Sequence, residues 1–269
     1  MTIFVVHIND ILSTSSNPDD NLWFHDKLKA EWDISDLGPP KFALGIAITC
    51  DQPNCLILLS QTAKIDHLVE QYNQGDTHPV NTPMVAGLQL RRPDKSLPTP
   101  PKISHWIERT PYHSLVGSLM YLAIVTRPDI AYAVGRLASF LDCYRPKHWT
   151  ATICVLRYLK GTCSYSLTLG GQNSLAISGY SDSDYANCID TSRSVGGYCF
   201  TLGSGMVSWS SRKQATVADS TCYAEYMALH DATHKVLFLR QLLAGLHLLP
   251  PLLLCINSKT LTYRLWLRE

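Results

Sequence analysis

The sequence predicts a mixed α/β (α+β) fold in which a largely helical middle segment lies between two regions that contain strands. Stretches with hydrophobic residues at every third or fourth position alternate along the chain with short stretches in which every second residue is hydrophobic. Hydrophobic residues make up 46% of the 269 positions, which is enough to fill a substantial core. Prolines recur between residues 78 and 111 and divide the chain into two halves.

The first half is predicted to begin with a strand, a turn and a helix. Residues 3–8 favour a strand, Asn9-Asp10 a turn, and residues 21–32 a helix with Leu22, Trp23, Phe24 and Leu28 on its apolar face. KFALGIAIT and CLILLS, separated by DQPN, predict two strands of a hairpin. QTAKIDHLVEQY has the spacing of an amphipathic helix.

In the proline-rich stretch we expect neither a helix nor a central strand. A helical stripe begins at Tyr112, and Pro128 is suited to the first turn of a second helix. A third helix, HWTATICVLRYLKG, is expected to end at Gly161.

The second half ends in an α/β pattern. LAISGYSD, GGYCFTL and MVSWSS predict three short antiparallel strands. A long helix is expected from about Asp219 to Leu243, followed by a buried strand in LLLCI. That helix would bring the last strand back beside the first of the three.

Charge is unevenly distributed, although the formal net charge is only +1. Residues 1–70 contain four Lys or Arg against ten Asp or Glu, a balance of −6; residues 102–170 contain eight against three, a balance of +5. The basic segment could follow a phosphate backbone or could be an ordinary solvated surface.

Nine cysteines without a CxxC pair predict reduced, buried thiols in an intracellular protein of the cytoplasm or nucleus. The N-terminus lacks the basic residue and cleavage site of a signal peptide, so we expect no secretion. The apolar stretch LLAGLHLLPPLLLCI is too short to span a membrane as a helix.

Three carboxylates could form a metal site. Asp182 and Asp184 end the first C-terminal strand, and Glu225 lies one turn into the long helix. Carboxylates that converge in this way bind hard divalent cations such as Mg²⁺. Alternatively, the aspartates only form a turn and Glu225 is a solvated helix residue.

Several motifs, in this order, closely resemble the end of a copia-type retrotransposon Pol polyprotein, where reverse transcriptase is followed by ribonuclease H. They are DLGPPKFALGI, LLSQTAKIDHL, VNTPM, TPYHSLVGSLMYLAIVTRPDIAYAV, HWTATICVLRYLKGT, GYSDSDYA, RSVGGYCFTLG, VSWSSRKQATVADSTCYAEYMAL and LFLRQLL. The resemblance implies a truncated palm, thumb and connection followed by a ribonuclease H-like mixed sheet with helices. The implied segments are a partial reverse transcriptase (1–90), a Pro-rich linker (91–111), a helical connection (112–170) and a C-terminally truncated ribonuclease H-like domain (171–269).

The resemblance also implies site residues. Asp182 and Glu225 match carboxylates that, with others, hold two Mg²⁺ (or Mn²⁺) ions and cut the RNA strand of an RNA–DNA hybrid. Asp184 ranks below Asp182. The third carboxylate of the family should stand where this chain has Ile256, which cannot bind Mg²⁺. Asp231 is a poor substitute, because six helical positions rotate by about 600°, or roughly 240° around the axis.

The N-terminal VVHINDIL resembles the family's hairpin of Tyr-Val-Asp-Asp type, whose aspartates bind the metals of polymerisation. His7 stands for the tyrosine, Asn9 for the first aspartate, and only Asp10 keeps its charge. Since a neutral amide cannot supply that charge and the chain begins here, we expect no DNA synthesis.

Three functions stay open at this point. The chain could be a retroelement fragment that keeps the hybrid-binding fold but has lost polymerase and ribonuclease H activity, a working ribonuclease H with two carboxylates, or a non-catalytic nucleic-acid-binding module without membrane association. Basic residues suited to nucleic acid are Arg127, Arg157, Lys160, Arg212 and Lys213. Tyr112, Tyr121 and Trp149 could stack on bases or belong to the core.

Overall fold

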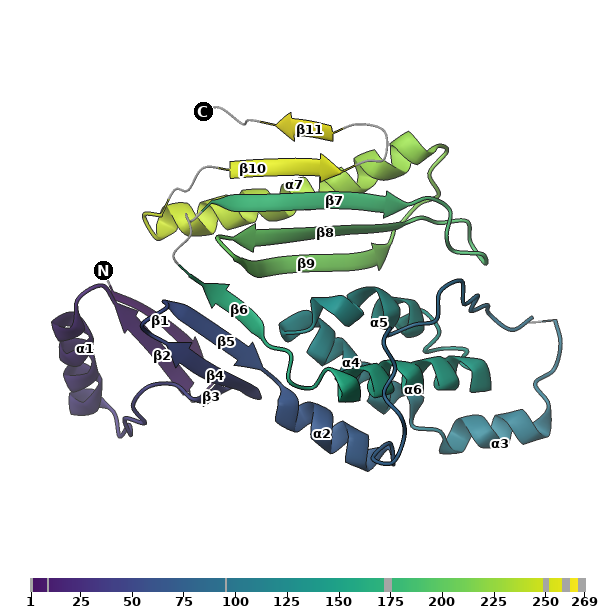
Figure 1. Cartoon of the computed structure of the whole chain (residues 1–269), viewed down its shortest axis with the longest axis horizontal. Coiled ribbons are helices and arrows are strands. Elements are labelled where there is room, and N and C mark those ends of the chain that lie inside the picture. Colours follow the sequence, from purple (N-terminus) through teal and green to yellow (C-terminus); the bar gives the residue numbers. More distant parts are fainter. Residues whose placement is uncertain are drawn as a thin grey trace. The chain divides into compact units, whose positions relative to one another are not determined.

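A computed structural model describes residues 2–8, 10–94, 96–171, 176–248, 252–257 and 262–265, with only the backbone for the last two ranges. The chain divides into two compact units, Met1–Thr49 and Cys50–Glu269. Both contain helices and strands, so the predicted mixed class is confirmed (Figure 1). Among the described residues, no helix is both long and apolar enough to cross a membrane.

The first unit contains an antiparallel hairpin, a helix and a second, very short hairpin. Its elements are β1 (Thr2–His7), β2 (Asp10–Ser15), α1 (Pro18–Glu31), β3 (Phe42–Ala43) and most of β4 (Ile46–Asp51). Helix α1 begins earlier than predicted, because the side chain of Asn17 accepts a hydrogen bond from the backbone N–H of Asp19 and Pro18 occupies the first turn. None of its residues is buried, and Leu22 and Trp23 are exposed.

KFALGIAIT does not form the single strand that its sequence predicts. Leu44 and Gly45 both have positive φ values, 52° and 73°, and they connect β3 to β4. Two consecutive left-handed residues form the tight turn that joins paired antiparallel strands, and Ala43 pairs directly with Ile46.

The second unit begins with β5 (Leu56–Ser60) and a group of helices. Their order is α2 (Thr62–Gln71), α3 (Pro101–Arg109), α4 (Tyr112–Val125), the 3₁₀ turn η1 (Pro128–Ile130), α5 (Ala131–Ala138) and α6 (Pro146–Gly161). The predicted stripe of α2 is confirmed, since Ile65, Leu68 and Val69 are buried in the helical core. Helix α6 ends at Gly161 as predicted.

One expectation for this region is wrong, and one strand has no counterpart among the predicted elements. Helix α3 lies inside the proline-rich stretch, because its prolines fall at the N-cap and the first helical position, where no backbone N–H is needed. Strand β6 (Leu167–Gly170) was not predicted and pairs antiparallel with β5.

The C-terminal sheet has the strand order β11-β10-β7-β8-β9. Its elements are β7 (Ile177–Asp184), β8 (Val195–Leu202), β9 (Gly205–Lys213), α7 (Thr221–Gly245), β10 (Leu252–Asn257) and β11 (Thr262–Leu265). The antiparallel β7-β8-β9 and the parallel pairing of β10 with β7 are as predicted, and β11 was not foreseen. Helix α7 lies along this sheet (Figure 1), and Phe200 of β8 is fully buried with Ala232 and Val236 of α7.

The described cysteines are all free, but they are not uniformly buried. Cys188 is buried, whereas Cys50, Cys55 and Cys222 are exposed. The expectation of buried thiols therefore holds for only part of them.

Candidate metal-binding carboxylates

Strand β7 and helix α7 bring Asp182 and Glu225 together. Asp182 is the third-last residue of β7, and Glu225 lies in the second turn of α7, which starts where Ser220 accepts a hydrogen bond from the backbone N–H of Tyr223. The two carboxylates interact directly, and Asp182 is exposed whereas Glu225 is half-buried. The predicted convergence of a strand-end aspartate and a helix glutamate is therefore present.

The environment of Glu225 disfavours its charge. Burial raises the pKa of this carboxyl above its ordinary value, the negative charge of Asp182 raises it further, and the backbone N–H of Ser183 opposes the change. Glu225 Oε2 is buried and has no hydrogen-bond partner among the described residues. A cation between the two carboxylates would relieve both the repulsion and the missing contact.

Gln214 fixes the start of α7 beside β7, a role that no sequence pattern indicates. Its Nε2 donates to the carbonyl oxygen of Ala224 at 2.8 Å and to Ser183 Oγ at 3.2 Å. The residue is 8% exposed. Because Ala224 precedes Glu225 and Ser183 follows Asp182, one side chain bonds a neighbour of each carboxylate residue, the backbone of Ala224 and the hydroxyl of Ser183.

Other acidic residues are engaged elsewhere. Asp184 accepts a hydrogen bond from the side-chain amide of Asn187, and Asp231 forms an ion pair with Arg212 at 3.0 Å. In the parallel pairing of β10 with β7, Ile256 lies opposite Ser181, next to Asp182 in the chain. The described part of the chain holds no cluster of three or more His, Cys, Asp or Glu side chains suited to a metal. Among the described residues, the structure therefore brings two carboxylates together at this position.

The hairpin of the first unit keeps Asp10 at the surface. His7 pairs directly with Asp10, so Asp10 begins β2 instead of lying in the turn, and Ile8 has a positive φ of 54°. Asn9, the predicted neutral replacement, lies outside the described residues.

Three of the five basic candidates are occupied within the protein. Arg127 is only 2% exposed, and its guanidinium donates to Asp129 and to Thr162. Lys160 donates to the backbone carbonyl oxygens of residues 74, 75 and 77, and Arg157 Nε donates to that of residue 78 at 2.8 Å. Arg127 therefore cannot meet a phosphate, and the other two hold the loop after α2.

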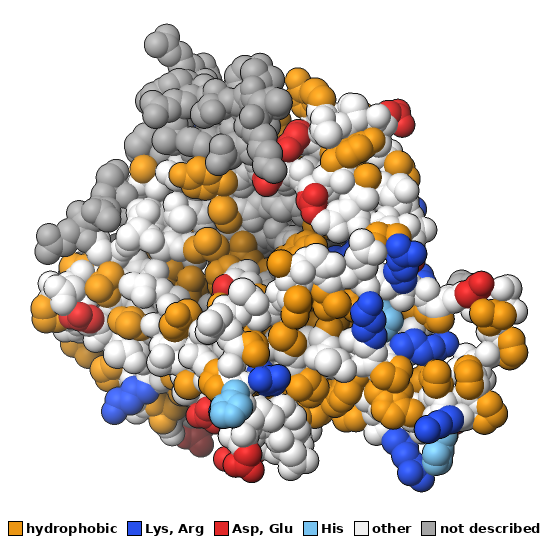
Figure 2. Space-filling model, turned by 45° about the vertical axis from the view of Figure 1, so that its right-hand side comes forward, with side chains coloured by type: hydrophobic (Ala, Val, Ile, Leu, Met, Phe, Trp, Pro, Cys, Tyr) orange, Lys and Arg blue, Asp and Glu red, His pale blue; other side chains and the backbone are white. Residues whose placement is uncertain are grey.

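Arg212 and Lys213, at the end of β9, are the other two basic candidates for nucleic-acid contact. Arg212 is exposed, although it pairs with Asp231, and Lys213 is half-buried. On the face shown in Figure 2, basic side chains lie singly or in small groups among hydrophobic and uncharged ones.

Of the aromatic candidates for base stacking, Tyr112 is fully buried and donates to the carbonyl oxygen of Leu137, so it belongs to the core.

The comparisons with known proteins identify the family. The chain is 36% identical over 247 residues to the Retrovirus-related Pol polyprotein from transposon TNT 1-94 of Nicotiana tabacum, covering 91% of this chain and 18% of that protein. It is 34% identical over 256 residues to the corresponding polyprotein from transposon RE1 of Arabidopsis thaliana, covering 94% of this chain and 17% of the relative. A Secreted RxLR effector protein 161 of Plasmopara viticola is 47% identical over 133 residues, 49% of this chain and 94% of that protein.

No family model matches the chain, and no solved structure matches it. The chain spans less than a fifth of the length of the Pol polyproteins it matches. Because the similarity to several such polyproteins extends over most of the chain, this protein belongs to the family of copia-type retrotransposon Pol polyproteins.

Proposed function

We propose that this chain is a Pol-derived fragment whose C-terminal sheet and helix form a ribonuclease H-type fold that holds an RNA–DNA hybrid. In this proposal Asp182 and Glu225 keep one divalent-cation site, efficient two-metal cleavage is lost at Ile256, and polymerisation is lost at the N-terminal hairpin. The observation that carries the proposal is the like-charged pair with a buried, partnerless Glu225 oxygen.

The topology supports this proposal. Three antiparallel strands, a long helix and a strand returning in parallel beside the first are the order expected for the implied domain. The arrangement places the end of β7 beside the second turn of α7, where a strand carboxylate and a helix carboxylate can share a cation.

Mg²⁺ or Mn²⁺ at this position would supply the positive charge that activates water and stabilises the leaving oxygen in phosphate chemistry. Asp182 and Glu225 would hold it, and Gln214 would keep the two carboxylates at a fixed separation. With one aliphatic residue in place of the third ligand, the cleavage rate should fall by orders of magnitude. Location inside the cell is part of the same proposal.

A working ribonuclease H with two carboxylates is the second candidate, favoured by the same partnerless oxygen of Glu225. A separate binding module built on the basic helical segment has less support, because Arg127, Arg157 and Lys160 serve internal contacts.

Two measurements test the proposal. Purified full chain is incubated with an RNA–DNA hybrid and Mg²⁺ or Mn²⁺, and its thermal stability is recorded with and without each cation. We expect cation-dependent stabilisation that Asp182→Asn abolishes and the control Asp184→Asn preserves, together with little or no cleavage. Robust cleavage that Asp182→Asn abolishes would favour the second candidate. No cation-dependent stabilisation and no cleavage would refute both.

A further inference from the structure

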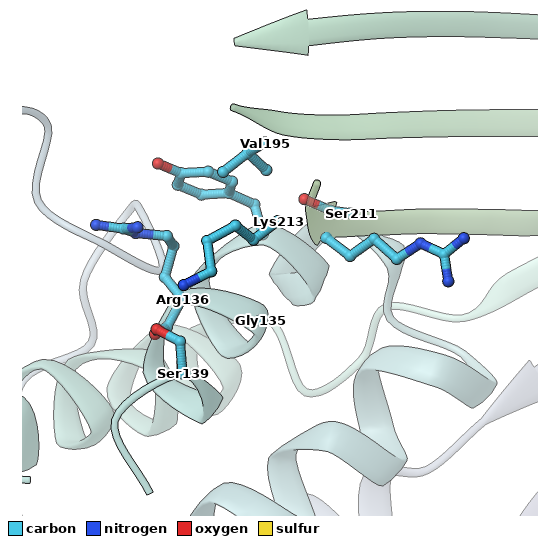
Figure 3. A pocket seen from close by; sticks show the side chains of 8 residues that line it. Gly135, Arg136, Ser139, Val195, Ser211 and Lys213 are labelled. Atoms are coloured by element: carbon cyan, nitrogen blue, oxygen red, sulfur yellow. The ribbon is translucent and has the colours of Figure 1, made fainter. Parts of the chain in front are cut away.

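A small hollow lies between helix α5 and strand β9, and basic and hydroxyl side chains line it. It is lined by Tyr132, Gly135, Arg136, Ser139, Val195, Ser211, Arg212 and Lys213. In Figure 3 the side chain of Lys213 extends from β9 toward Arg136 of α5 and Ser139, the residue that follows this helix. No sequence pattern indicates Arg136, because only the packing of α5 against β9 brings it to Lys213.

Arg212 pairs with Asp231, but the charges of Arg136 and Lys213 are not neutralised by carboxylates of the described residues. Among the described residues, no Asp or Glu forms an ion pair with Arg136 or Lys213. The nearby acids of this region are engaged, since Asp142 pairs with Arg92 at 2.6 Å and Asp190 accepts from the backbone N–H of Arg92. Two cations held close together without counter-charges create a local positive potential that attracts an anion.

The buried thiol of Cys188 responds to this potential. Lys213 Nζ donates to Cys188 Sγ at 3.9 Å. Burial would raise the pKa of the thiol, but hydrogen bonding by Thr191 and the nearby Lys213 and Arg136 hold it below its ordinary value. The thiol is a weak partner for either cation, so both keep capacity for a stronger acceptor.

The hollow opens on the same sheet face as Asp182. Asp182 of β7, Gly197 of β8 and Ser211 of β9 are directly paired and form one row across the three strands. Asp184, Val195 and Lys213 form a second row, two residues along each strand. A Cβ on Gly196 would contact Ala228 of α7, so Gly196 faces α7 and the residues of these two rows lie on the other face of the sheet. Asp182 lies close to the end of β7, where it still interacts with Glu225 at the start of α7. Strands two apart are separated by about 10 Å, a distance that a few base pairs of duplex span.

We propose that Arg136 and Lys213, assisted by the hydroxyls of Ser211 and Tyr132, bind a backbone phosphate of the nucleic acid whose scissile strand lies at Asp182 and Glu225. This inference rests on the proposed hybrid-binding function and adds to it a phosphate contact that spans the helical segment and the C-terminal sheet. Such a contact fixes the register of the duplex on the protein without reading its sequence.

The test is the affinity of the full chain for a fluorescently labelled RNA–DNA hybrid, measured by anisotropy at several salt concentrations. Arg136→Gln and Lys213→Gln are each expected to weaken binding about fivefold and to lower the salt slope by about one. Lys213→Arg should retain affinity because it keeps the charge. The matched control Lys102→Gln removes an exposed cation of α3 and should leave the slope unchanged.

The outcomes separate this inference from the proposed function. Wild-type binding with both glutamine variants equal to Lys102→Gln would overturn the phosphate site and leave the proposed function standing. No hybrid binding by the wild type, even at low salt, would overturn both. If Lys213→Gln has a lower melting temperature than the wild type, the affinities of Arg136→Gln and Lys213→Arg are used instead. A packing defect would not be restored by a substitution that keeps the positive charge.

Discussion

Replacing Arg127 by Met tests whether this buried cation holds the helical segment together. The guanidinium donates to Asp129 at 3.0 Å and 2.7 Å, and to the carbonyl oxygen and hydroxyl of Thr162 at 3.0 Å and 2.5 Å. These bonds join the turn before α5 to the end of α6. Met fills a similar volume but leaves the Asp129 charge and the Thr162 carbonyl oxygen without this donor.

Breaking one side of a buried pair costs about 3–5 kcal/mol. Because the Asp129 side chain is 31% exposed, water replaces part of the contact, and we expect the lower end, about 3 kcal/mol. For a unit of this size that corresponds to a fall in Tm of roughly 6–12 °C. The assay is urea and thermal denaturation of the full chain, with Arg109→Met, an exposed arginine of α3, as the matched control.

Acidification provides an internal check on the mechanism. Burial alone would raise the pKa of Asp129, but the hydrogen bonds and charge of Arg127 hold it below its ordinary value. The pair therefore stabilises the protein above the unfolded pKa of about 4 and loses its contribution as pH falls through the folded pKa. The wild type and Arg127→Met should converge in acid. A variant with full stability but weakened hybrid binding would refute this role and restore Arg127 as a nucleic-acid contact.

Three further changes probe the carboxylates and the strand packing. Because the folded pKa of Glu225 is raised, its charged form opposes folding near neutral pH. Glu225→Gln should therefore raise Tm in EDTA at pH 7 and leave Tm unchanged below about pH 4, where the carboxyl is protonated in both states. The variant should also lose the cation-dependent stabilisation. Gly205→Ala would place a Cβ 2.6 Å from the Thr168 carbonyl oxygen and should cost about 1–3 kcal/mol in urea denaturation, whereas Gly117→Ala, which meets nothing within 4 Å, should not destabilise. Ile256→Asp should increase Mn²⁺-dependent stabilisation and hybrid cleavage; unchanged values would contradict the assignment of Ile256 as the lost ligand.

Local sequence patterns were sufficient where one periodicity dominated. The stripe of α2, the antiparallel β7-β8-β9 and the parallel return of β10 all follow from hydrophobic spacing and connection length. Patterns failed where a special backbone geometry decided the outcome. Leu44 and Gly45 have left-handed backbone conformations and interrupt the strand that the hydrophobic pattern predicts. Pro100 and Pro101 lie at the start of α3, where proline is tolerated, although the many prolines of this stretch predict no helix.

The candidate site divides in the same way. Asp182 and Glu225 are identifiable from the sequence, because their motifs place one at a strand end and the other at a helix start. Gln214 and Arg136 are not, because each gains its role from contacts with residues distant in the chain: Gln214 with Ser183, and Arg136 with the environment of Lys213.

The sequence by itself determined the mixed class of the fold, the order of its C-terminal elements and the family to which the chain is related. Tertiary structure decided how its charges are used. Arg127 and Lys160 look the same as Arg136 and Lys213 in a count of basic residues. Packing pairs the first two with oxygens inside the protein and leaves the other two without a carboxylate partner among the described residues. The physical reason is that the free energy of a charge depends on the partners and solvent around it, which only the folded chain defines.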